Sequence, residues 1–418
     1  MGAQLSNIIP KLHRRLMPTL LMMYVLAFLD RANASFAKAG LAADAGVGDA
    51  AFAFGAGIFF VGYAFLEVPS NLILHKVGAR RWMARIMISW GLVSAANAFV
   101  HTPAQFHAVR FLLGMAEAGF FPGIIYYLTT WYPTAARARS VGVFYYGAPI
   151  ALTLGGPLSG YLVGQDAFGL HGWQVMFIVE GLAASLGGFA VLFLLKDRPE
   201  DAPWLTSEEK SVLRAALNAD EDTREHPGLL DALLNRRILY LALVYFLVQS
   251  GFYGLTFYLP TQVARLMGAS IGFQVGLVTA LPWICALIAV TVIPAWCDAR
   301  GNARPVGAVT MAISGLALAV SALAGSPLVA LAALCVAAAG LIVTPALFWT
   351  MPTALLGGAA AAGGIALINS IGNLGGFAAP NLRAQLELGF HSSSAGLLGL
   401  ATGTLIGACL FAAAPRKP

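Results

Sequence analysis

Four charged residues lie inside strongly apolar stretches of this sequence. Asp30 and Arg31 are neighbours in AFLDRANASF, residues 27–36, at the end of the apolar run MPTLLMMYVLAF. Arg110 and Glu117 are seven positions apart, which places them almost two helical turns apart on one face of a helix. In hydrocarbon each such charge costs at least about 2.5 to 3.5 kcal/mol. We therefore expect these side chains either to pair or to form a functional site.

The chemistry open to these side chains is anion binding and proton transfer. The guanidinium of Arg31 is a fixed fork of donors that matches a carboxylate, although an ion pair with Asp30 or another acid is the structural alternative. Because neighbours on a helix point about 100° apart, we expect one of Asp30 and Arg31 to face a cavity and the other a neighbouring helix. Glu117 is a candidate proton site, with Arg110 near enough to interact through long side chains or a water molecule.

The composition indicates which solvent surrounds the chain. Of the 418 residues, 59% are apolar and only 11% are charged, which is typical of a membrane protein. Apolar runs of about 20 residues recur throughout, and we predict an all-α membrane protein with twelve transmembrane helices. The predicted spans are 16–38, 50–74, 82–100, 104–131, 139–164, 173–195, 237–261, 271–295, 305–325, 327–349, 358–382 and 393–414.

The basic residues predict the orientation of these spans. Twenty of the 25 lysines and arginines lie near the two termini or in alternate loops, which places that side in the cytoplasm by the positive-inside rule. Lys38, Arg265 and Arg383 belong to the opposite side. We therefore expect both termini to be cytoplasmic and no buried arginine or acid within a span of the second half.

The chain also repeats itself. The loop after the second span and the loop after the eighth share a pattern offset by 223 residues, formed by His75, Gly78 and Arg81 in one and Asp298, Gly301 and Arg304 in the other. This repeat predicts two pseudo-symmetric six-helix bundles, 1–195 and 237–418, joined by a cytoplasmic linker, 196–236. Thr206 and Glu209 form a capping box that should open a linker helix, lying against the membrane or the bundle, with an apolar face of Val212, Leu213, Ala216 and Leu217.

Twelve spans in two parallel repeats with a basic Gly-Arg loop resemble the major facilitator superfamily. Within it, FLDRANASFA, GIFFVGYAFLEVPSNLILHKVGARRW, RFLLGMAEAGFFPGIIYYLTTWYP and WLTSEEK resemble the anion:cation symporter family, especially its tartrate-transporter-like organic-acid permeases. The resemblance implies that Asp30 and Glu117 carry coupling protons and that Arg31 holds the substrate carboxylate. The resemblance also implies that the two Gly-Arg loops are gating loops, and His75 departs from the superfamily, whose loop usually has Asp there. GGPLSG, residues 155–160, partly echoes an antiporter motif, but we expect it to serve close helix packing.

Further polar residues within spans could complete a site. Tyr63 matches a cavity position of the resembling family, and Tyr253, Trp349, Asn369 and Asn373 could line the same cavity, together with Arg110; a packed or lipid-facing position is the alternative for each aromatic residue. The two asparagines are one turn apart and would recognise hydroxyl groups. For Glu67 we expect pairing with Arg85 or with an amide donor, and for Glu180 a similar structural role.

Several classes of function are excluded by what the sequence lacks. It has no phosphate-binding Gly-Lys loop, no zinc-ligand spacing and no Ser/His/Asp set, and its four cysteines fall in apolar segments, so we expect no enzyme, metal or cofactor other than protons as the coupling ion. We expect a monomeric proton symporter in a bacterial inner membrane that imports a small organic carboxylate, with no nucleic-acid partner. The alternatives are a proton-coupled exporter of drugs or metabolites, which two arginines in the cavity disfavour for cationic drugs, and a non-transporting sensor.

Overall fold

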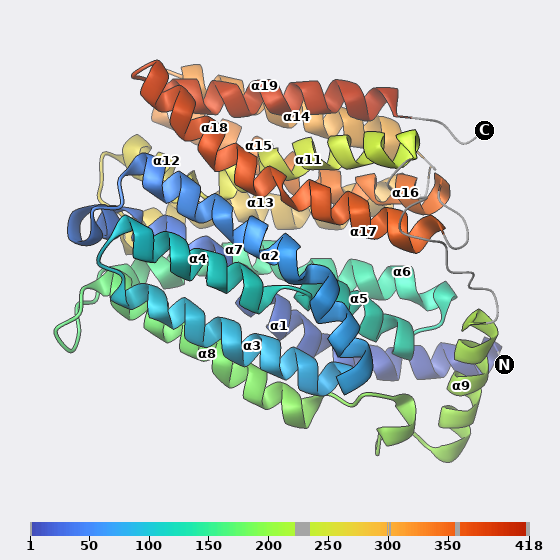
Figure 1. Ribbon diagram of the computed structural model, residues 1–418. Helices are drawn as coiled ribbons and strands as arrows, with labels where there is room; N and C mark the ends of the chain where they lie inside the picture. The colour runs from blue at the N-terminus through green and yellow to red at the C-terminus, as the bar shows by residue number, and fades with distance from the viewer. Residues whose placement is uncertain (1, 222–234, 299, 301, 356–359, 415–418) are drawn as a thin grey trace.

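The computed structural model describes residues 2–221, 235–298, 300, 302–355 and 360–414. These residues form helices joined by short loops, and the only β-type pairing among them is an isolated bridge between Ala167 and Leu170. Figure 1 shows two layers of helices, α1 to α8 in one and α11 to α19 in the other, with both termini at the same end of the molecule. We call that end the terminal side and the opposite end the far side.

The first half contains eight α-helices that run back and forth between these two ends. They are α1 (Gly2–Ala45), α2 (Asp49–Val77), α3 (Ala79–Ala96), α4 (Pro103–Glu117), α5 (Phe120–Trp131), α6 (Thr134–Tyr145), α7 (Gly147–Val163) and α8 (Gly172–Leu194). The first of them is much longer than the predicted span, and it continues through Pro10 and Pro18.

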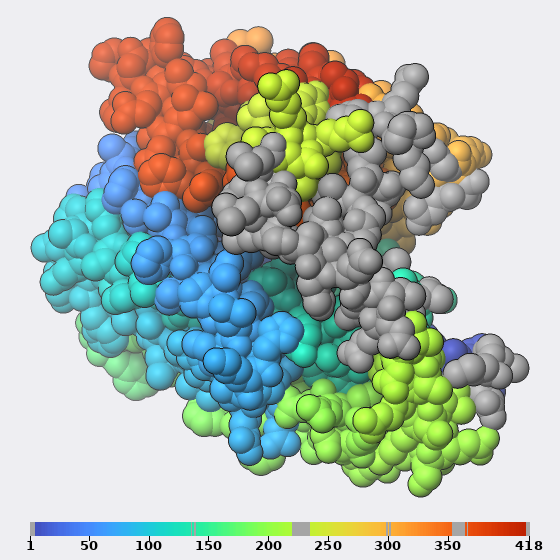
Figure 2. Space-filling view, turned by 45° about the vertical axis from the view of Figure 1, so that its right-hand side comes forward, coloured from blue at the N-terminus to red at the C-terminus, as the bar shows by residue number. Residues whose placement is uncertain are grey.

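The second half has the same general course. Its described helices are α11 (Arg236–Thr256), α12 (Leu259–Met267), α13 (Phe273–Asp298), α14 (Ala303–Leu323), α15 (Pro327–Phe348), α16 (Thr350–Leu355), α17 (Ala360–Asn373), α18 (Gly375–Gly389) and α19 (Ser393–Ala413). In the space-filling view the two halves form the upper and lower parts of the molecule (Figure 2).

Ten helical segments in the described residues are long and apolar enough to cross a membrane. They coincide with ten of the twelve predicted spans. The other two predicted spans are also helical but differ in character: α3 carries Arg80, Arg81 and Arg85, and the span 358–382 is divided between α17 and α18. The fold class predicted from the sequence is therefore confirmed. Of the two remaining segments, one is more basic than a typical span and the other is broken into two helices.

Several predicted spans contain a break between two helices or end at one. The span 104–131 divides into α4 and α5 at Gly119, whose φ of +84° is a conformation that glycine adopts without a Cβ penalty. Other breaks separate α6 from α7, α15 from α16 and α17 from α18. In membrane transporters such breaks are tolerated where the backbone is buried in protein or lines a cavity, and here they bring Glu117, Tyr145 and Asn373 to helix ends.

The predicted linker helix is present as α9 (Ser207–Glu221). Its capping box is formed, because Glu209 accepts a hydrogen bond from the Thr206 backbone and the Thr206 hydroxyl accepts one from the Glu209 backbone. Leu213 is fully buried, and Lys11 of α1 bonds Glu209 at 2.8 Å, which holds the pKa of that carboxyl below its usual value. The helix is therefore docked on the bundle.

The two halves pack closely at the far side. There α2 packs along α18, and α7 packs along α13. A Cβ at Gly156 would lie 2.5 Å from the carbonyl oxygen of Gly276, and one at Gly160 would lie 2.6 Å from that of Gly272. Such an approach needs residues without a side chain. GGPLSG therefore serves close helix packing, as predicted, and the packing it serves is between the two halves.

Candidate functional site

Arg31 lies between the two halves and is bonded to both. Its Nε donates to Glu117 Oε1 at 2.9 Å, and Nη2 donates to the same oxygen. Its Nη1 donates to the hydroxyl of Tyr253, on α11, at 3.0 Å. The ion pair that the sequence left open as an alternative is thus present, but the partner is Glu117 of α4 rather than the adjacent Asp30.

Aromatic rings enclose the guanidinium of Arg31. Its Cζ lies 5.2 Å from the centroid of the Phe28 ring and 5.5 Å from those of Phe59 and Tyr63. Each ring attracts the cation through its negative face and excludes water from it. Arg31 is only 9% exposed, so any ligand it binds would meet a desolvated charge.

Asp30 faces away from Arg31, as the helical angle between neighbours predicted. Its Oδ1 accepts hydrogen bonds from Ser94 of α3 and, at 3.2 Å, from Asn33. The side chain is 2% exposed and does not line the cavity described below. Asp30 is therefore a buried acid that lies behind the arginine within the first half.

Glu117 and Arg110 share α4 but are not directly hydrogen-bonded to each other in the described structure. Arg110 is fully buried, its Nε lies 3.4 Å from the carbonyl oxygen of Gly55, and its two terminal nitrogens have no hydrogen-bond partner among the described residues. Its guanidinium lies 5.2 Å from the ring of Phe59. The interaction expected between Arg110 and Glu117 is thus electrostatic, and Glu117 bonds Arg31 instead.

A cavity of about 80 Å³ lies beside Arg31, between the halves. Of the residues predicted for the site, Arg31, Tyr63, Tyr253, Asn369 and Asn373 line it. The cavity is not lined by the four others, namely Asp30, Glu117, Arg110 and Trp349. Trp349 contacts it indirectly, because its indole nitrogen donates to the hydroxyl of Tyr245, a lining residue, at 3.3 Å.

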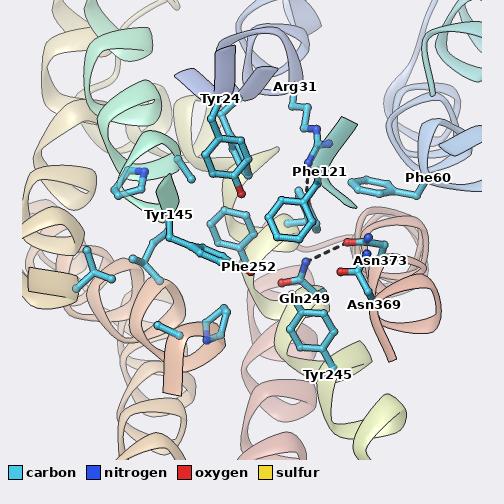
Figure 3. A pocket seen from close by; sticks show the side chains of 18 of the residues that line it. Tyr24, Arg31, Phe60, Phe121, Tyr145, Tyr245, Gln249, Phe252, Asn369 and Asn373 are labelled. Carbon is cyan, nitrogen blue, oxygen red and sulfur yellow. Dashed lines mark hydrogen bonds between the residues drawn. The ribbon is translucent and has the colours of Figure 1, made fainter. Parts of the chain in front are cut away.

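The wall contributed by the second half carries three amides. Gln249 of α11 donates to Asn373 Oδ1 at 3.2 Å, and Asn369 lies one turn before Asn373 (Figure 3). Figure 3 shows these amides on the side of the cavity opposite to Arg31. Gln249 was not among the residues predicted for the site, because a single glutamine within an apolar span gives a weaker signal than a charge; the cost of burying its amide is the signal that could have identified it.

Glu67 of α2 is 5% exposed and reaches the second half. Its Oε1 accepts a hydrogen bond from Asn369 and its Oε2 accepts one from Ser370, each at 3.0 Å. The amide donor predicted for Glu67 is therefore confirmed, whereas Arg85 stacks on Trp82 with its Cζ 4.5 Å from the ring centroid. Glu180 accepts a hydrogen bond from Ser159 at 2.7 Å within the first half, a contact consistent with the structural role expected for it.

A group of charges lies near the far side of the molecule, outside the lining of the cavity. Two cations contact the ring of Tyr258 of the second half, with Lys38 Nζ 4.9 Å and Arg383 Cζ 4.1 Å from its centroid. Lys38 pairs with Asp49 at 2.7 Å, and Arg383 pairs with Glu387 at 2.7 Å. Arg383 lies one residue past the predicted span 358–382, within which no buried arginine was expected, and yet it is only 1% exposed, because it packs against the ring of Tyr258.

The predicted gating loops are only partly described. The ring of His75 lies 4.0 Å from that of Tyr126, and Gly78 has a φ of +94° where α2 turns into α3. Arg81 is exposed beside a polar hollow that also includes Asp197, whose Oδ1 accepts a bond from the Arg80 backbone at 2.8 Å.

In the second half, Arg304 donates to the carbonyl oxygen of Ala412. The side chain of Asp298 and all of Gly301 lie outside the described residues. The structural equivalence of the two loops thus stays a prediction.

Two helical layers, interrupted helices and a cavity between the halves are the features expected of a membrane transporter. The sequence matches the Major Facilitator Superfamily over residues 20–380. The chain belongs to this superfamily.

Three relatives cover nearly the whole chain. Inner membrane transport protein RhmT of Escherichia coli (strain K12) is 48% identical over 98% of this chain and 95% of its own. A quinolone resistance transporter of Acinetobacter baumannii is 42% identical, covering 95% and 92%. A putative tartrate transporter of Agrobacterium vitis is 43% identical, covering 97% and 90%. The similarity to tartrate-transporter-like permeases that the motifs indicated is thus confirmed.

A solved structure supports the fold at low sequence identity. The partially occluded, inward-open xylose transporter XylE from E. coli aligns with a TM-score of 0.74 and 14% identity, covering 94% of this chain and 97% of that one.

Proposed function

We propose that this transporter imports an organic acid anion by proton symport. The observation that carries the proposal is Arg31, a permanently charged bidentate donor that lines the cavity and is held there by a protonatable acid, Glu117. A carboxylate is the ligand that best matches the guanidinium fork. A tartrate-like hydroxy acid, a sugar acid and an aromatic carboxylate all fit this chemistry.

The charges of the first half supply a reason for coupling. Nearest the cavity's guanidinium, Arg31 and Arg110 are balanced by Asp30 and Glu117 when both acids are ionised, and Glu67 and Glu180 are further buried acids of this half. An anionic substrate entering this desolvated site would add an uncompensated negative charge, which is costly in a low dielectric. Uptake of a proton by one of the acids removes that excess, so substrate and proton would bind together more favourably than either alone.

Glu117 offers a direct route for this exchange. As a carboxylate it occupies Nε and Nη2 of Arg31, the edge that a substrate would use. As a neutral acid it would bind the guanidinium more weakly, because hydrogen bonds between charged partners are roughly twice as strong as neutral ones. Protonation of Glu117 would therefore free Arg31 for the substrate carboxylate, and Asp30 is a second candidate proton carrier.

The opposite wall suits hydroxyl groups on a small substrate. Gln249, Asn369 and Asn373 supply amide donors and acceptors facing the cavity. The volume of about 80 Å³ is far below the roughly 300 Å³ at the low end of pockets for drug-sized ligands. Together these features favour a small hydroxylated acid.

The orientation in the membrane follows from the basic residues near the termini and in alternate loops. With both termini in the cytoplasm of a bacterial inner membrane, the far side would face the periplasm. The closely packed far side then corresponds to a state closed to the periplasm, and rocking of the halves about the central site would open it. A monomer in the lipid bilayer is sufficient for this scheme.

An exporter that exchanges drugs or metabolites for protons is the second candidate. It is favoured by the 42% identity to the quinolone resistance transporter. The two arginines of the first half disfavour cationic compounds, but an anionic compound could use the same site. The direction of transport therefore has to be measured.

Purified protein in liposomes would test the proposal. With an alkaline interior and a more acidic exterior, wild-type protein should accumulate labelled tartrate or another hydroxy acid from a panel, and a protonophore should abolish the accumulation. Arg31→Ala should bind and transport none of them. No uptake or counterflow of any carboxylate, together with proton-driven movement of a drug, would replace the importer with the exporter.

A further inference from the structure

Glu67 connects the two halves on the terminal side of the cavity. It lies in the second part of α2, toward the end of that helix near the termini, while α17 and α18 of the opposite half run beside it. The contact differs from the far-side packing, which depends on glycines and close backbone approach. It consists of a buried carboxylate and two side-chain donors, Asn369 and Ser370.

The bonds to Glu67 are among those that join the halves directly. Arg31 to Tyr253, Asn369 to Glu67 and Ser370 to Glu67 all link side chains of different halves. Two of these three thus converge on one carboxylate. Because a hydrogen bond to an ionised acceptor is stronger than a neutral one, this carboxylate is suited to hold α17 against α2.

The chemistry of the carboxylate also sets the orientation of Asn369. An ionised carboxylate only accepts hydrogen bonds, so the amide nitrogen of Asn369 has to face it. The carbonyl oxygen of Asn369 is then directed to the other side of the amide, and Asn369 is a lining residue of the cavity (Figure 3). An acceptor presented to the cavity needs a donor on the ligand, such as a hydroxyl group.

We propose that Glu67 is a positioning residue that latches the two halves on the terminal side and fixes the Asn369 amide with its carbonyl oxygen toward the substrate. The latch is a property of the empty protein. The selectivity that follows from it rests on the proposed function, since it concerns how a carboxylate substrate with hydroxyl groups is distinguished from one without them.

The latch predicts how readily the cavity is reached. Glu67→Gln replaces the charged acceptor with a neutral amide, and Ser370→Ala removes one of the two donors without altering Asn369. A difference of one charge-assisted bond corresponds to roughly a tenfold change in an equilibrium constant. Both variants should therefore open the terminal side more often, Glu67→Gln most of all. Glu180→Gln is the matched control, because Glu180 is also a buried acid bonded to a hydroxyl but contacts only the first half.

The accessibility experiment needs no substrate. A single cysteine placed at Ala346, a small lining residue, would be introduced into a variant without the four native cysteines, and its rate of reaction with a maleimide measured in purified protein. The rate should rise roughly tenfold in Glu67→Gln and by a smaller factor in Ser370→Ala, and should be unchanged in Glu180→Gln. Equal rates in Glu67→Gln and the parent would overturn the latch.

The selectivity experiment compares ligand pairs that differ only in hydroxyl groups, such as tartrate and succinate or mandelate and phenylacetate. An amide at position 67 can face Asn369 with either end, so the preference of wild-type protein for the hydroxylated member should fall roughly tenfold in Glu67→Gln. Ser370→Ala and Glu180→Gln should keep the wild-type preference.

The outcomes separate the two proposals. If wild-type protein binds carboxylates and Glu67→Gln leaves both the preference and the labelling rate unchanged, the role of Glu67 is wrong and the proposed function stands. If wild-type protein binds no carboxylate of the panel, the proposed function fails, and the labelling rate alone decides whether Glu67 is a latch.

Discussion

Replacing Glu117 with glutamine separates substrate binding from proton coupling. The amide is similar in size to the carboxylate but cannot release a proton, so it resembles the protonated acid. In the wild-type structure Glu117 Oε1 occupies two donors of Arg31. A substrate carboxylate that takes those donors must displace an anion in wild-type protein and only a neutral amide in Glu117→Gln.

The size of the effect follows from these two bonds. Hydrogen bonds to charged groups contribute about 1.5 to 3 kcal/mol and neutral ones about 0.5 to 1.5 kcal/mol, so the competitor is weakened by about 1 to 1.5 kcal/mol per bond. For both bonds this is about 2 to 3 kcal/mol, or roughly 30- to 150-fold in affinity. The gain should appear at alkaline pH, where wild-type Glu117 is ionised, and should vanish at acid pH.

Calorimetry or thermal-shift titration of one carboxylate at several pH values would measure this. Wild-type affinity should fall as the pH rises, whereas Glu117→Gln should bind with nearly constant affinity, exchange substrate across a membrane and fail to accumulate it against a gradient. Glu180→Gln controls for the loss of a buried acid elsewhere in the first half. The reasoning is refuted if Glu117→Gln keeps the wild-type pH dependence, or if it binds as poorly as a variant lacking Arg31.

Substitutions at three further positions test other parts of the site. Arg31→Lys keeps the charge but loses the fork, so carboxylate affinity should fall roughly tenfold or more, and near-normal binding would reassign Arg31 to a structural role. Asp30→Asn should keep binding but lose accumulation if Asp30 carries a proton, whereas loss of binding in a titration would mean that its charge serves the arginines. Tyr258→Leu should open the cavity from the far side and raise maleimide labelling of the cysteine placed at Ala346, while Tyr258→Phe, which keeps an aromatic ring beside Lys38 and Arg383, should not.

The sequence predicted those features that depend on local spacing. The apolar runs marked the spans, the capping box at Thr206 marked the start of α9, and the small residues of GGPLSG marked a close helix contact. The 100° between neighbours on a helix also predicted that Asp30 and Arg31 would face different surroundings. The spans follow from the composition of runs of about 20 residues, and the other features follow from residues within about two helical turns of one another.

Pairing between distant helices could not be predicted in the same way. Glu117 bonds Arg31, which is 86 positions away, rather than Arg110 on its own helix, and Glu67 bonds Asn369 across 302 positions. Such contacts depend on how each helix is rotated and where it breaks. The turn at Gly119, two residues after Glu117, packs against Ser70 of α2, and Arg383 is buried against Tyr258 of the loop after α11; both placements depend on contacts between helices, which the periodicity of one segment does not contain.

The placement of charge explains how the halves could separate at low cost. The ion pairs nearest the interface each lie within one half: Arg31 with Glu117, Lys38 with Asp49, and Arg383 with Glu387. The hydrogen bonds that cross the interface join Arg31 and Glu67 to neutral partners: Arg31 donates to Tyr253, and Glu67 accepts from Asn369 and Ser370. Breaking a buried ion pair by removing one partner costs about 3 to 5 kcal/mol, whereas the loss of a neutral partner can be compensated by water entering the opening. A rocking motion would therefore leave Arg31 paired with Glu117 and Arg383 paired with Glu387. The contacts that change would be the hydrogen bonds of Arg31 and Asn369 across the interface, and both of these residues line the cavity where a substrate would bind.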